Sequence, residues 1–331
     1  MPGRRYEPED AVELSVVVPV YGCADCVEAL TERLTRSVRE VTAAYELIFV
    51  DDRSRDGAWP KLQQLARKDP HVRAFRLSRN FGQHAAITAG LAQSRGERAV
   101  VMDCDLQDPP ELIPLLHSRA QEGFDVVMAR RTGRRSTWRR FASRAYSKLM
   151  KAFLGTEMSG DIANLSVISR KVIDAFLALG DLDRQYILIL RWLGFEQSIV
   201  EFEQPERFTG RSSYTLPMLV RVALDGVFFQ TTTLLRWIVY AGFLAALAGL
   251  LLALVFIVIY LTHSPYPLPG WTSLSVLVLL MGGFIILSTG VTGLYIGKIF
   301  QQVKGRPLYV IDEVTSRLSA AAEPVAQRRA R

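Results

Sequence analysis

The stretch Leu-Ser-Val-Val-Val-Pro-Val at residues 14–20 is a short apolar run that is rich in Val. Such a run is typical of a strand that is buried on both faces of a parallel sheet. Further strands are predicted at 46–50, 72–77, 99–102 and 125–129, and helices at 27–44, 59–66 and 84–93. This alternation of strands and helices predicts an α/β domain whose parallel-rich sheet is covered by helices on both faces.

Polar clusters follow the second and the fourth predicted strands, at the point where each strand ends. Asp51 and Asp52 follow the second strand, and Asp103 and Asp105 follow the fourth within the run Met-Asp-Cys-Asp-Leu-Gln-Asp-Pro-Pro-Glu at 102–111. Ligands of open α/β sheets bind at the carboxyl ends of the strands. We therefore expect an active site at this edge of the sheet.

Asp103 and Asp105 are candidate ligands of a divalent cation, directly or through water. Mg²⁺ prefers hard oxygen ligands, which it usually shares with substrate phosphates, and a bound metal neutralises charge on a diphosphate leaving group. Asp51 and Asp52 are candidate acceptors for a nucleoside base or ribose. The alternative is structural, because Ser54 or Asp56 in the same segment could cap the following helix.

The segment Arg-Phe-Thr-Gly-Arg-Ser-Ser-Tyr at 207–214 suits phosphate binding. It combines guanidinium groups, hydroxyls and a Gly that permits close approach of the backbone. Arg207, Arg211, Ser212 and Ser213 are therefore candidate ligands of an acceptor phosphate. The alternative is a basic anchor beside a membrane.

Two long apolar stretches, 237–261 and 271–297, lie in the last third of this chain of 331 residues, which is 49% hydrophobic and carries a net charge of +7. Each exceeds the roughly 20 residues that cross a bilayer as a helix. Basic residues flank the pair, whereas the connecting loop 262–270 has no Lys or Arg. Because positive residues stay inside, the positive-inside rule predicts a multi-pass protein of the inner (cytoplasmic) membrane, with both termini and the catalytic domain cytoplasmic.

Residues 130–155 form a predicted amphipathic helix with one basic face. A helix of this kind lies on an anionic membrane surface. Its alternatives are a solvated basic face or a nucleic-acid site, and the predicted spans favour the membrane over nucleic acid. The expected organisation is a catalytic domain at 1–205, a phosphate loop and juxtamembrane helix at 206–233, two transmembrane helices at 234–299, and a strand with a disordered tail at 300–331.

Three cysteines, Cys23, Cys26 and Cys104, occur in the chain. Cys23 and Cys26 have the spacing of redox and zinc motifs, but no second Cys pair or nearby His completes a metal set. Because cytoplasmic thiols are normally kept reduced, we expect ordinary reduced residues.

The motifs in this order resemble the family 2 glycosyltransferases of the dolichyl-phosphate mannose synthase and bactoprenol glucosyltransferase type. The resemblance rests on 17–21, 51–57, 103–111, 160–161, 207–214, the two-span hairpin and 304–309. It implies a GT-A fold, an inverting transfer that depends on Mg²⁺ or Mn²⁺, and a homotetramer. It also implies nucleotide contacts at Pro19, Tyr21, Asp51, Asp52 and Asp103, a metal at Asp103, Asp105 and Gln107, phosphate contacts at Arg130 and Arg207, and catalytic roles for Asp161 and Asp105.

The sequence departs from the family pattern at two places. Gly22 and Cys23 replace the usual Asn-Glu after Tyr21, which removes a carboxylate near the nucleotide. Ser213 stands where the phosphate loop often carries Lys, and Arg211 is expected to supply the missing charge.

The resemblance implies transfer of one sugar from a nucleotide-sugar, with UDP-glucose as the first choice, to polyprenyl phosphate at the cytoplasmic face. GDP-mannose or a modified UDP-sugar is an alternative donor. A polysaccharide-synthase-like activity is disfavoured because Leu188 stands where the Gln-x-x-Arg-Trp motif needs Gln. The intact Asp103 and Asp105 disfavour a non-enzymatic membrane protein.

Overall fold

The computed structural model describes residues 12–132, 162–182, 184–203, 238–244, 247–249 and 270–315, together with positions 251, 254, 258 and 262. The chain divides into two compact units. One contains residues 1–134, 161–210 and 306–331, and the other contains residues 135–160 and 211–305. The first unit therefore holds most of the predicted catalytic domain together with the C-terminal segment, whereas residues 135–160 of that predicted domain belong to the second unit.

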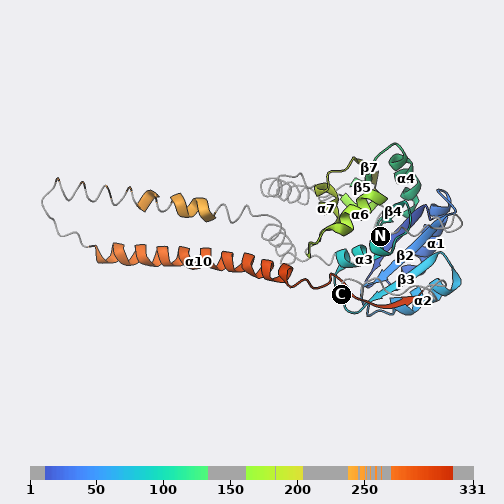
Figure 1. Ribbon diagram of the computed structural model, residues 1–331, viewed down its shortest axis with the longest axis horizontal. Helices are drawn as coiled ribbons and strands as arrows, with labels where there is room; N and C mark the ends of the chain where they lie inside the picture. Colours follow the sequence, from blue (N-terminus) through green and yellow to red (C-terminus); the bar gives the residue numbers. More distant parts are fainter. Residues whose placement is uncertain are drawn as a thin grey trace, which may run out of the picture. The chain divides into compact units, whose positions relative to one another are not determined.

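An eight-stranded mixed sheet is the centre of the first unit, in the order β7-β5-β6-β4-β1-β2-β3-β8 (Figure 1). The strands β1 to β4 run parallel, whereas β6 and β8 run antiparallel to the strands beside them. The sheet is therefore mixed: its four parallel strands agree with the predicted parallel-rich sheet, and β6 and β8 add antiparallel pairings to it. The bounds are β1 Leu14–Val20, β2 Tyr45–Asp51, β3 Val72–Leu77, β4 Arg98–Val101, β5 Val126–Thr132, β6 Ile162–Ser169, β7 Gln197–Glu203 and β8 Ile311–Thr315.

Helices cover both faces of this sheet. One hydrophobic cluster joins alternate residues of the strands to α1, α2 and α4, and a second cluster joins the other residues to α3, α6 and α7. The predicted helices at 27–44, 59–66 and 84–93 correspond to α1, α2 and α3. The bounds are α1 Val27–Arg39, α2 Ala58–Lys68, α3 Gln83–Gln93, η2 Pro110–Leu112, α4 Ile113–Gln121, α6 Arg170–Ala178 and α7 Tyr186–Trp192.

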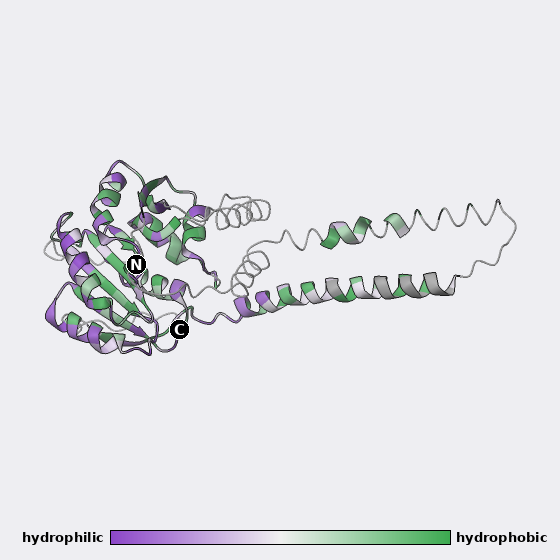
Figure 2. Cartoon of the chain, turned by 180° about the vertical axis from the view of Figure 1, so that it is seen from behind, coloured by the Kyte–Doolittle hydropathy of each residue, from purple (hydrophilic) through white to green (hydrophobic). Residues whose placement is uncertain are grey.

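The strand β1 is buried along its whole length, as its apolar sequence predicts. Val16 and Val18 contribute to the cluster of α1, whereas Val17 contributes to the cluster of α3, because successive side chains of a strand point to opposite faces. Gly90 of α3 packs so closely on β1 that an added Cβ would clash with Val17. Figure 2 shows the hydrophobic strands between more polar helices, which is the pattern of a two-sided core.

A buried ionic network joins the amino ends of three strands. The side chain of Glu46 is only 1% exposed and accepts hydrogen bonds from Ser15 Oγ at 2.8 Å, from Arg73 Nη1 at 2.7 Å and from the backbone N–H of Arg95 at 2.7 Å. Burial by itself raises the pKa of Glu46, but the two Arg side chains and the hydrogen bonds outweigh it and hold the pKa below its usual value. The network therefore fixes β1, β2 and β3 at the end of the sheet away from the predicted site.

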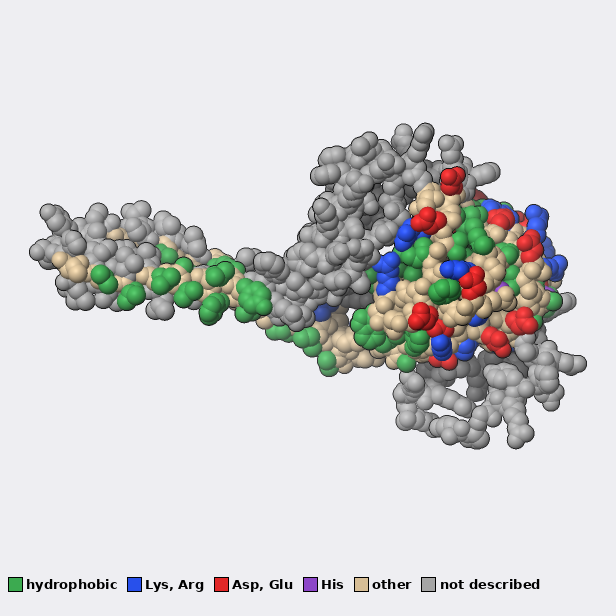
Figure 3. All heavy atoms as spheres, turned by 90° about the horizontal axis from the view of Figure 1, so that it is seen from above, with side chains coloured by type: hydrophobic (Ala, Val, Ile, Leu, Met, Phe, Trp, Pro, Cys, Tyr) green, Lys and Arg blue, Asp and Glu red, His purple; other side chains and the backbone are tan. Residues whose placement is uncertain are grey.

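The second unit contains α10, Trp271–Val303, which is apolar and has exposed apolar side chains such as Ile286 and Val303. Figure 3 shows hydrophobic side chains exposed along the helix. In the part of the chain that the structure describes, one helix, Met281–Val303, is long and apolar enough to cross a bilayer, by length and composition only. A shorter apolar helix covers Ile238–Gly249, and most of the predicted first span lies outside the described residues, so a two-helix hairpin stays a prediction.

Candidate active site

The carboxyl ends of β1, β2 and β4 meet at one edge of the sheet. The strand β1 lies between the other two, with Val20 beside Asp51 of β2 and Val17 beside Val101 of β4. The segments that follow these strands therefore lie close together, as the sequence predicts. Pro19 is buried within β1, whereas the side chain of Tyr21 just beyond it is 53% exposed.

Asp103 is held by two side-chain amides from other elements. Gln83 Nε2, at the start of α3, donates a 2.6 Å hydrogen bond to Asp103 Oδ1, and Asn164 Nδ2 of β6 lies 3.0 and 3.1 Å from Oδ1 and Oδ2. Burial raises the pKa of Asp103 to about 6, while the Asn164 hydrogen bond opposes that rise. An approaching cation would favour the ionised form. Neutral amide donors thus orient Asp103, and a bound cation could supply the positive charge that its carboxylate lacks.

Asp105 is exposed and lies two residues further along the same loop. Its Oδ1 accepts a 3.1 Å hydrogen bond from the backbone N–H of Gln107, and Leu106 between them has a φ of 58°. This left-handed residue turns the chain sharply after Asp105, a conformation that is uncommon for a side chain of its size.

Asp108 fastens the far end of this loop to β5. Its buried carboxylate accepts two hydrogen bonds of 2.9 Å from Arg131, one from Nε and one from Nη2. Burial raises the pKa of Asp108, and the Arg131 guanidinium opposes that rise. We name residues 103–108 the metal loop.

The metal loop suits a hard divalent cation that also binds substrate phosphate. Among the described residues, no group of three or more His, Cys, Asp and Glu side chains is placed to hold a metal. A fully protein-bound site is not required for Mg²⁺, which commonly takes one or two carboxylates and completes its shell with water and phosphate. Asp103 and Asp105 fit that kind of site.

Asp51 and Asp52 are both buried and already have protein contacts. Asp51 Oδ1 accepts a 3.0 Å hydrogen bond from the backbone N–H of Ser54, and its Oδ2 lies 3.2 Å from Arg76 Nε without a hydrogen bond. Asp52 accepts hydrogen bonds of 2.7 and 2.8 Å from the backbone N–H groups of Phe81 and Gly82. Asp52 thereby positions the loop before Gln83, while the buried Asp51 Oδ2 faces the guanidinium of Arg76.

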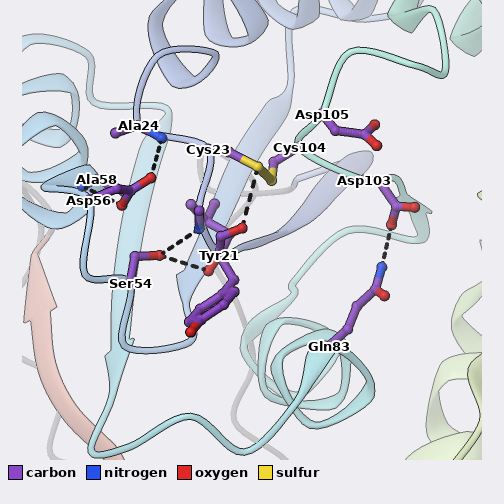
Figure 4. The surroundings of a disulfide bond; sticks show 12 residues. Tyr21, Cys23, Ala24, Ser54, Asp56, Ala58, Gln83, Asp103, Cys104 and Asp105 are labelled. Carbon is purple, nitrogen blue, oxygen red and sulfur yellow. Dashed lines mark hydrogen bonds between the residues drawn. A yellow bond between two sulfur atoms is a disulfide. The ribbon is translucent and has the colours of Figure 1, made fainter. Parts of the chain in front are cut away.

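The N-cap of α2 is Gly57, which makes no side-chain cap bond, but Asp56 Oδ1 accepts a 3.2 Å hydrogen bond from the backbone N–H of Ala58 at the start of the helix, as the structural alternative expects. Asp56 Oδ2 also accepts a 2.7 Å hydrogen bond from the backbone N–H of Ala24, and Ser54 Oγ accepts one of 3.4 Å from the backbone N–H of Gly22 (Figure 4). Gly22 has a φ of 71°, which a Gly adopts without steric cost. The segment after β2 therefore shapes the loop after β1, residues 21–26, which we name the nucleotide loop.

Arg130 is paired within the sheet. Its Nη1 donates a 3.2 Å hydrogen bond to Glu201 of β7, and its Nε is buried without a hydrogen-bond partner. Arg191 of α7 lies near enough that Arg130, after burial, contributes to lowering the pKa of Arg191. Arg130 and Arg191 therefore lie near one another at this corner of the sheet, with Glu201 as the partner of Arg130.

Comparison with known proteins identifies the family. The sequence profile "Glycosyl transferase family 2" matches residues 15–177. The "Uncharacterized glycosyltransferase YkcC" of Bacillus subtilis is 34% identical over 305 residues, which are 91% of this chain and 94% of that protein. This chain belongs to glycosyltransferase family 2.

Two further relatives have names that specify a lipid. They are called "Undecaprenyl-phosphate 4-deoxy-4-formamido-L-arabinose transferase". The one from Proteus mirabilis is 34% identical over 91% of this chain and 94% of its own length. The one from Pseudomonas paraeruginosa is 36% identical over 96% of this chain and 94% of its own length.

The cysteines of this family 2 glycosyltransferase differ from the prediction of three reduced residues. Cys23 of the nucleotide loop forms a disulfide with Cys104 of the metal loop, with a Cα–Cα distance of 6.4 Å, and Cys26 is free (Figure 4). The pair was missed because its members are 81 residues apart in sequence. Burial, followed by Asp105 and Asp25, raises the pKa of Cys26.

Several predicted site residues lie outside the described part of the chain. They are Asp161, Arg207, Arg211, Ser212 and Ser213, together with most of the predicted basic helix at 130–155. Conversely, Gln83, Asn164 and Arg131 contact the metal loop but were not predicted. No local motif marks them, because each reaches the loop through strand or helix packing.

Proposed function

We propose that this family 2 glycosyltransferase moves one sugar from a nucleotide-sugar to polyprenyl phosphate at the cytoplasmic face of the membrane. The observation that carries this proposal is the pair Asp103 and Asp105 at the carboxyl end of β4, beside the ends of β1 and β2. The names of the Proteus and Pseudomonas relatives, which match over nearly their whole length, support the lipid phosphate as acceptor.

The donor is proposed to be a UDP-sugar. UDP-glucose is the first choice from the sequence motifs, and a UDP-linked modified pentose is the second because of the relatives' names. Asp51, Tyr21 and Pro19 are proposed to contact the nucleoside. Asp52 is proposed to act indirectly by positioning the loop before α3, since its oxygens accept hydrogen bonds from Phe81 and Gly82.

Asp103, Asp105 and Gln107 are proposed to hold Mg²⁺ or Mn²⁺, which when bound would neutralise charge on the leaving diphosphate. Asp105 would present an exposed carboxylate, and Asp103 would be kept in place by Gln83 and Asn164. The dependence on metal would appear as loss of transfer with EDTA and its return when Mn²⁺ is added.

The acceptor needs little help to become a nucleophile. A phosphomonoester has a second pKa of about 6, so it is largely dianionic at neutral pH. Its oxygen would form a bond to the anomeric carbon while the bond from that carbon to the nucleoside diphosphate breaks, which inverts the configuration. The protein must then overcome the repulsion between two anions, and Arg side chains on the acceptor side can do so.

Arg207, Arg211, Ser212 and Ser213 are proposed to bind the lipid phosphate, with Arg130 reaching the same anions. Asp161 is proposed to position the acceptor near the reacting carbon. Arg207→Ala should reduce transfer roughly tenfold or more, because a hydrogen bond to a charged group contributes about 1.5–3 kcal/mol. Unchanged transfer and unchanged lipid dependence in this variant would reduce the segment to a surface anchor.

The membrane location rests on α10 and the flanking charges. Apolar side chains on this helix are exposed, unlike those of a core helix, and Lys298 and Lys304 lie near its C-terminal end. We propose two spans with both termini cytoplasmic, a basic interface helix at 130–155 and a homotetramer.

A donor panel tests the proposed function. Purified protein in lipid nanodiscs would be incubated with polyprenyl phosphate, Mn²⁺ and one radiolabelled nucleotide-sugar at a time, and label in the lipid extract would be counted. One UDP-sugar should label the lipid, and omission of polyprenyl phosphate should abolish the signal. Label in a polymer instead of the lipid would support a polysaccharide-synthase-like activity.

A further inference from the structure

The metal loop carries a cysteine between its two candidate metal ligands. Cys104 lies between Asp103 and Asp105 and is only 6% exposed. Its sulfur is joined to Cys23, which follows Tyr21 and Gly22 in the nucleotide loop (Figure 4). The disulfide therefore links the two loops on which the metal and the nucleoside of the proposed reaction depend.

Both linked loops are also held by hydrogen bonds that do not involve the cysteines. Asp56 anchors the backbone N–H of Ala24, and Gln83 and Asn164 anchor Asp103. These contacts do not depend on the disulfide, so they are expected to hold both loops in place when it is reduced. The cross-link can therefore form and break without rearrangement of the sheet.

Disulfides of cytoplasmic proteins are usually transient and serve catalysis or redox sensing, because glutathione and thioredoxin reduce permanent ones. We propose that Cys23 and Cys104 form a reversible redox-modification site that lowers glycosyl transfer when oxidised and restores it when reduced. The effect on transfer rests on the proposed function. The co-reactant is a low-molecular-weight disulfide for oxidation and a low-molecular-weight thiol for reduction.

The oxidation step balances without a cofactor. The thiolate of one cysteine attacks a sulfur of the small disulfide, which forms a mixed disulfide and releases one small thiolate. The sulfur of the other cysteine then attacks the mixed disulfide, the Cys23–Cys104 bond forms, and a second small thiolate leaves. The protons of the two cysteines pass to the two departing thiolates, so two protein thiols are oxidised and one small disulfide is reduced.

Oxidation should lower activity because of where the cross-link falls. A divalent ion such as Mg²⁺ demands near-ideal octahedral geometry. Asp103 is fixed by two amides, so any adjustment of Asp105 around a shared ion depends on the backbone at Cys104, which lies between the two carboxylates. A bond from Cys104 to the nucleotide loop removes that freedom, whereas Cys26 is not joined to the metal loop.

Full-length protein in nanodiscs would be treated with oxidised glutathione or with dithiothreitol. Differential alkylation and peptide mass spectrometry would report the thiols, and calorimetry would report the binding of UDP with Mn²⁺. We expect a Cys23–Cys104 cross-link after oxidation, at least about tenfold weaker transfer, weaker UDP–Mn²⁺ binding, and full recovery with dithiothreitol. Cys26→Ser is the matched control and should keep this response, whereas Cys104→Ser and Cys23→Ser should each lose it.

Two results would overturn the proposal. One is alkylation of both Cys23 and Cys104 after oxidation; the other is an equal loss of transfer and UDP binding in Cys23→Ser. Reversal by dithiothreitol in the wild-type protein keeps the test valid even if Cys104→Ser fails to fold. Failure of the proposed function is distinguishable, because a reduced protein that labels no lipid with any donor still reports its cross-link and its UDP–Mn²⁺ binding.

Discussion

Removal of the Arg131 guanidinium should destabilise the protein and loosen the metal loop. Arg131 donates two hydrogen bonds of 2.9 Å to Asp108, whose side chain is 0% exposed while that of Arg131 is 26% exposed. Breaking a buried ion pair by deleting one partner costs about 3–5 kcal/mol, and the partial exposure of Arg131 places Arg131→Met nearer to about 2–3 kcal/mol. Urea unfolding, followed by intrinsic fluorescence at constant m, measures this loss.

The loss should depend on pH in a direction fixed by Asp108. Its pKa in the folded protein is raised by burial, and without Arg131 it should rise further. The folded variant then binds a proton more readily than the unfolded chain, so its stability is greatest below the ordinary Asp pKa and falls as pH rises through the raised value. The destabilisation should therefore be smaller in mildly acidic than in mildly alkaline buffer.

The chain offers a matched control in the exposed pair of Arg33 and Glu111. This pair also has two hydrogen bonds, of 2.8 and 2.7 Å, but the side chains are 35% and 54% exposed. Arg33→Met should cost at most about 1 kcal/mol, as exposed pairs do. The double variant Arg131→Met with Asp108→Leu should recover part of the stability. Equal losses for Arg131→Met and Arg33→Met at every pH would show that burial adds nothing to the contribution of the Arg131–Asp108 pair.

Three further predictions concern other parts of the molecule. Glu46→Gln should reduce stability at neutral pH and make stability less dependent on acid pH. The lowered pKa of Glu46 contributes stability above the pKa of the unfolded chain, and this contribution is lost as pH falls through the pKa of the folded protein, which an acid titration of unfolding measures. Asn164→Ala should raise the Mn²⁺ concentration for half-maximal transfer roughly tenfold, since Asp103 loses a charge-assisted hydrogen bond; an unchanged metal titration would contradict it. Cysteines introduced at 262–270 should react with an impermeant reagent from outside intact cells and those near Arg317 should not, and the reverse pattern would contradict the proposed topology.

The parallel strands β1 to β4 could be predicted from the sequence because short local patterns mark each strand. The apolar run of β1 and the polar residues after β2 and β4 are local features, and β1 indeed lies between β2 and β4. Packing within the sheet then places Asp51 and Asp103 at one edge. Fold class and the candidate metal loop could therefore be predicted from short stretches of the chain.

Contacts between distant segments could not be predicted in the same way. Asn164 reaches Asp103 because β6 pairs antiparallel with β4, and no periodicity in the sequence specifies that pairing. The spacing of Cys23 and Cys26 indicates a local pair, whereas the sheet brings Cys23 to Cys104. Asp52 illustrates the same limit, since its carboxylate holds the loop before α3.

The central claim is that Asp103 and Asp105 hold the metal through which a nucleotide-sugar is used to glycosylate polyprenyl phosphate. The most direct measurement is lipid-linked product against Mn²⁺ concentration for the wild-type protein, Asp103→Asn and Asp105→Asn, with urea unfolding of each variant as the check on folding. We expect Mn²⁺-dependent product from the wild type and no product from either folded variant at any Mn²⁺ concentration. Wild-type amounts of product from both variants, or from the wild type in EDTA, would contradict it.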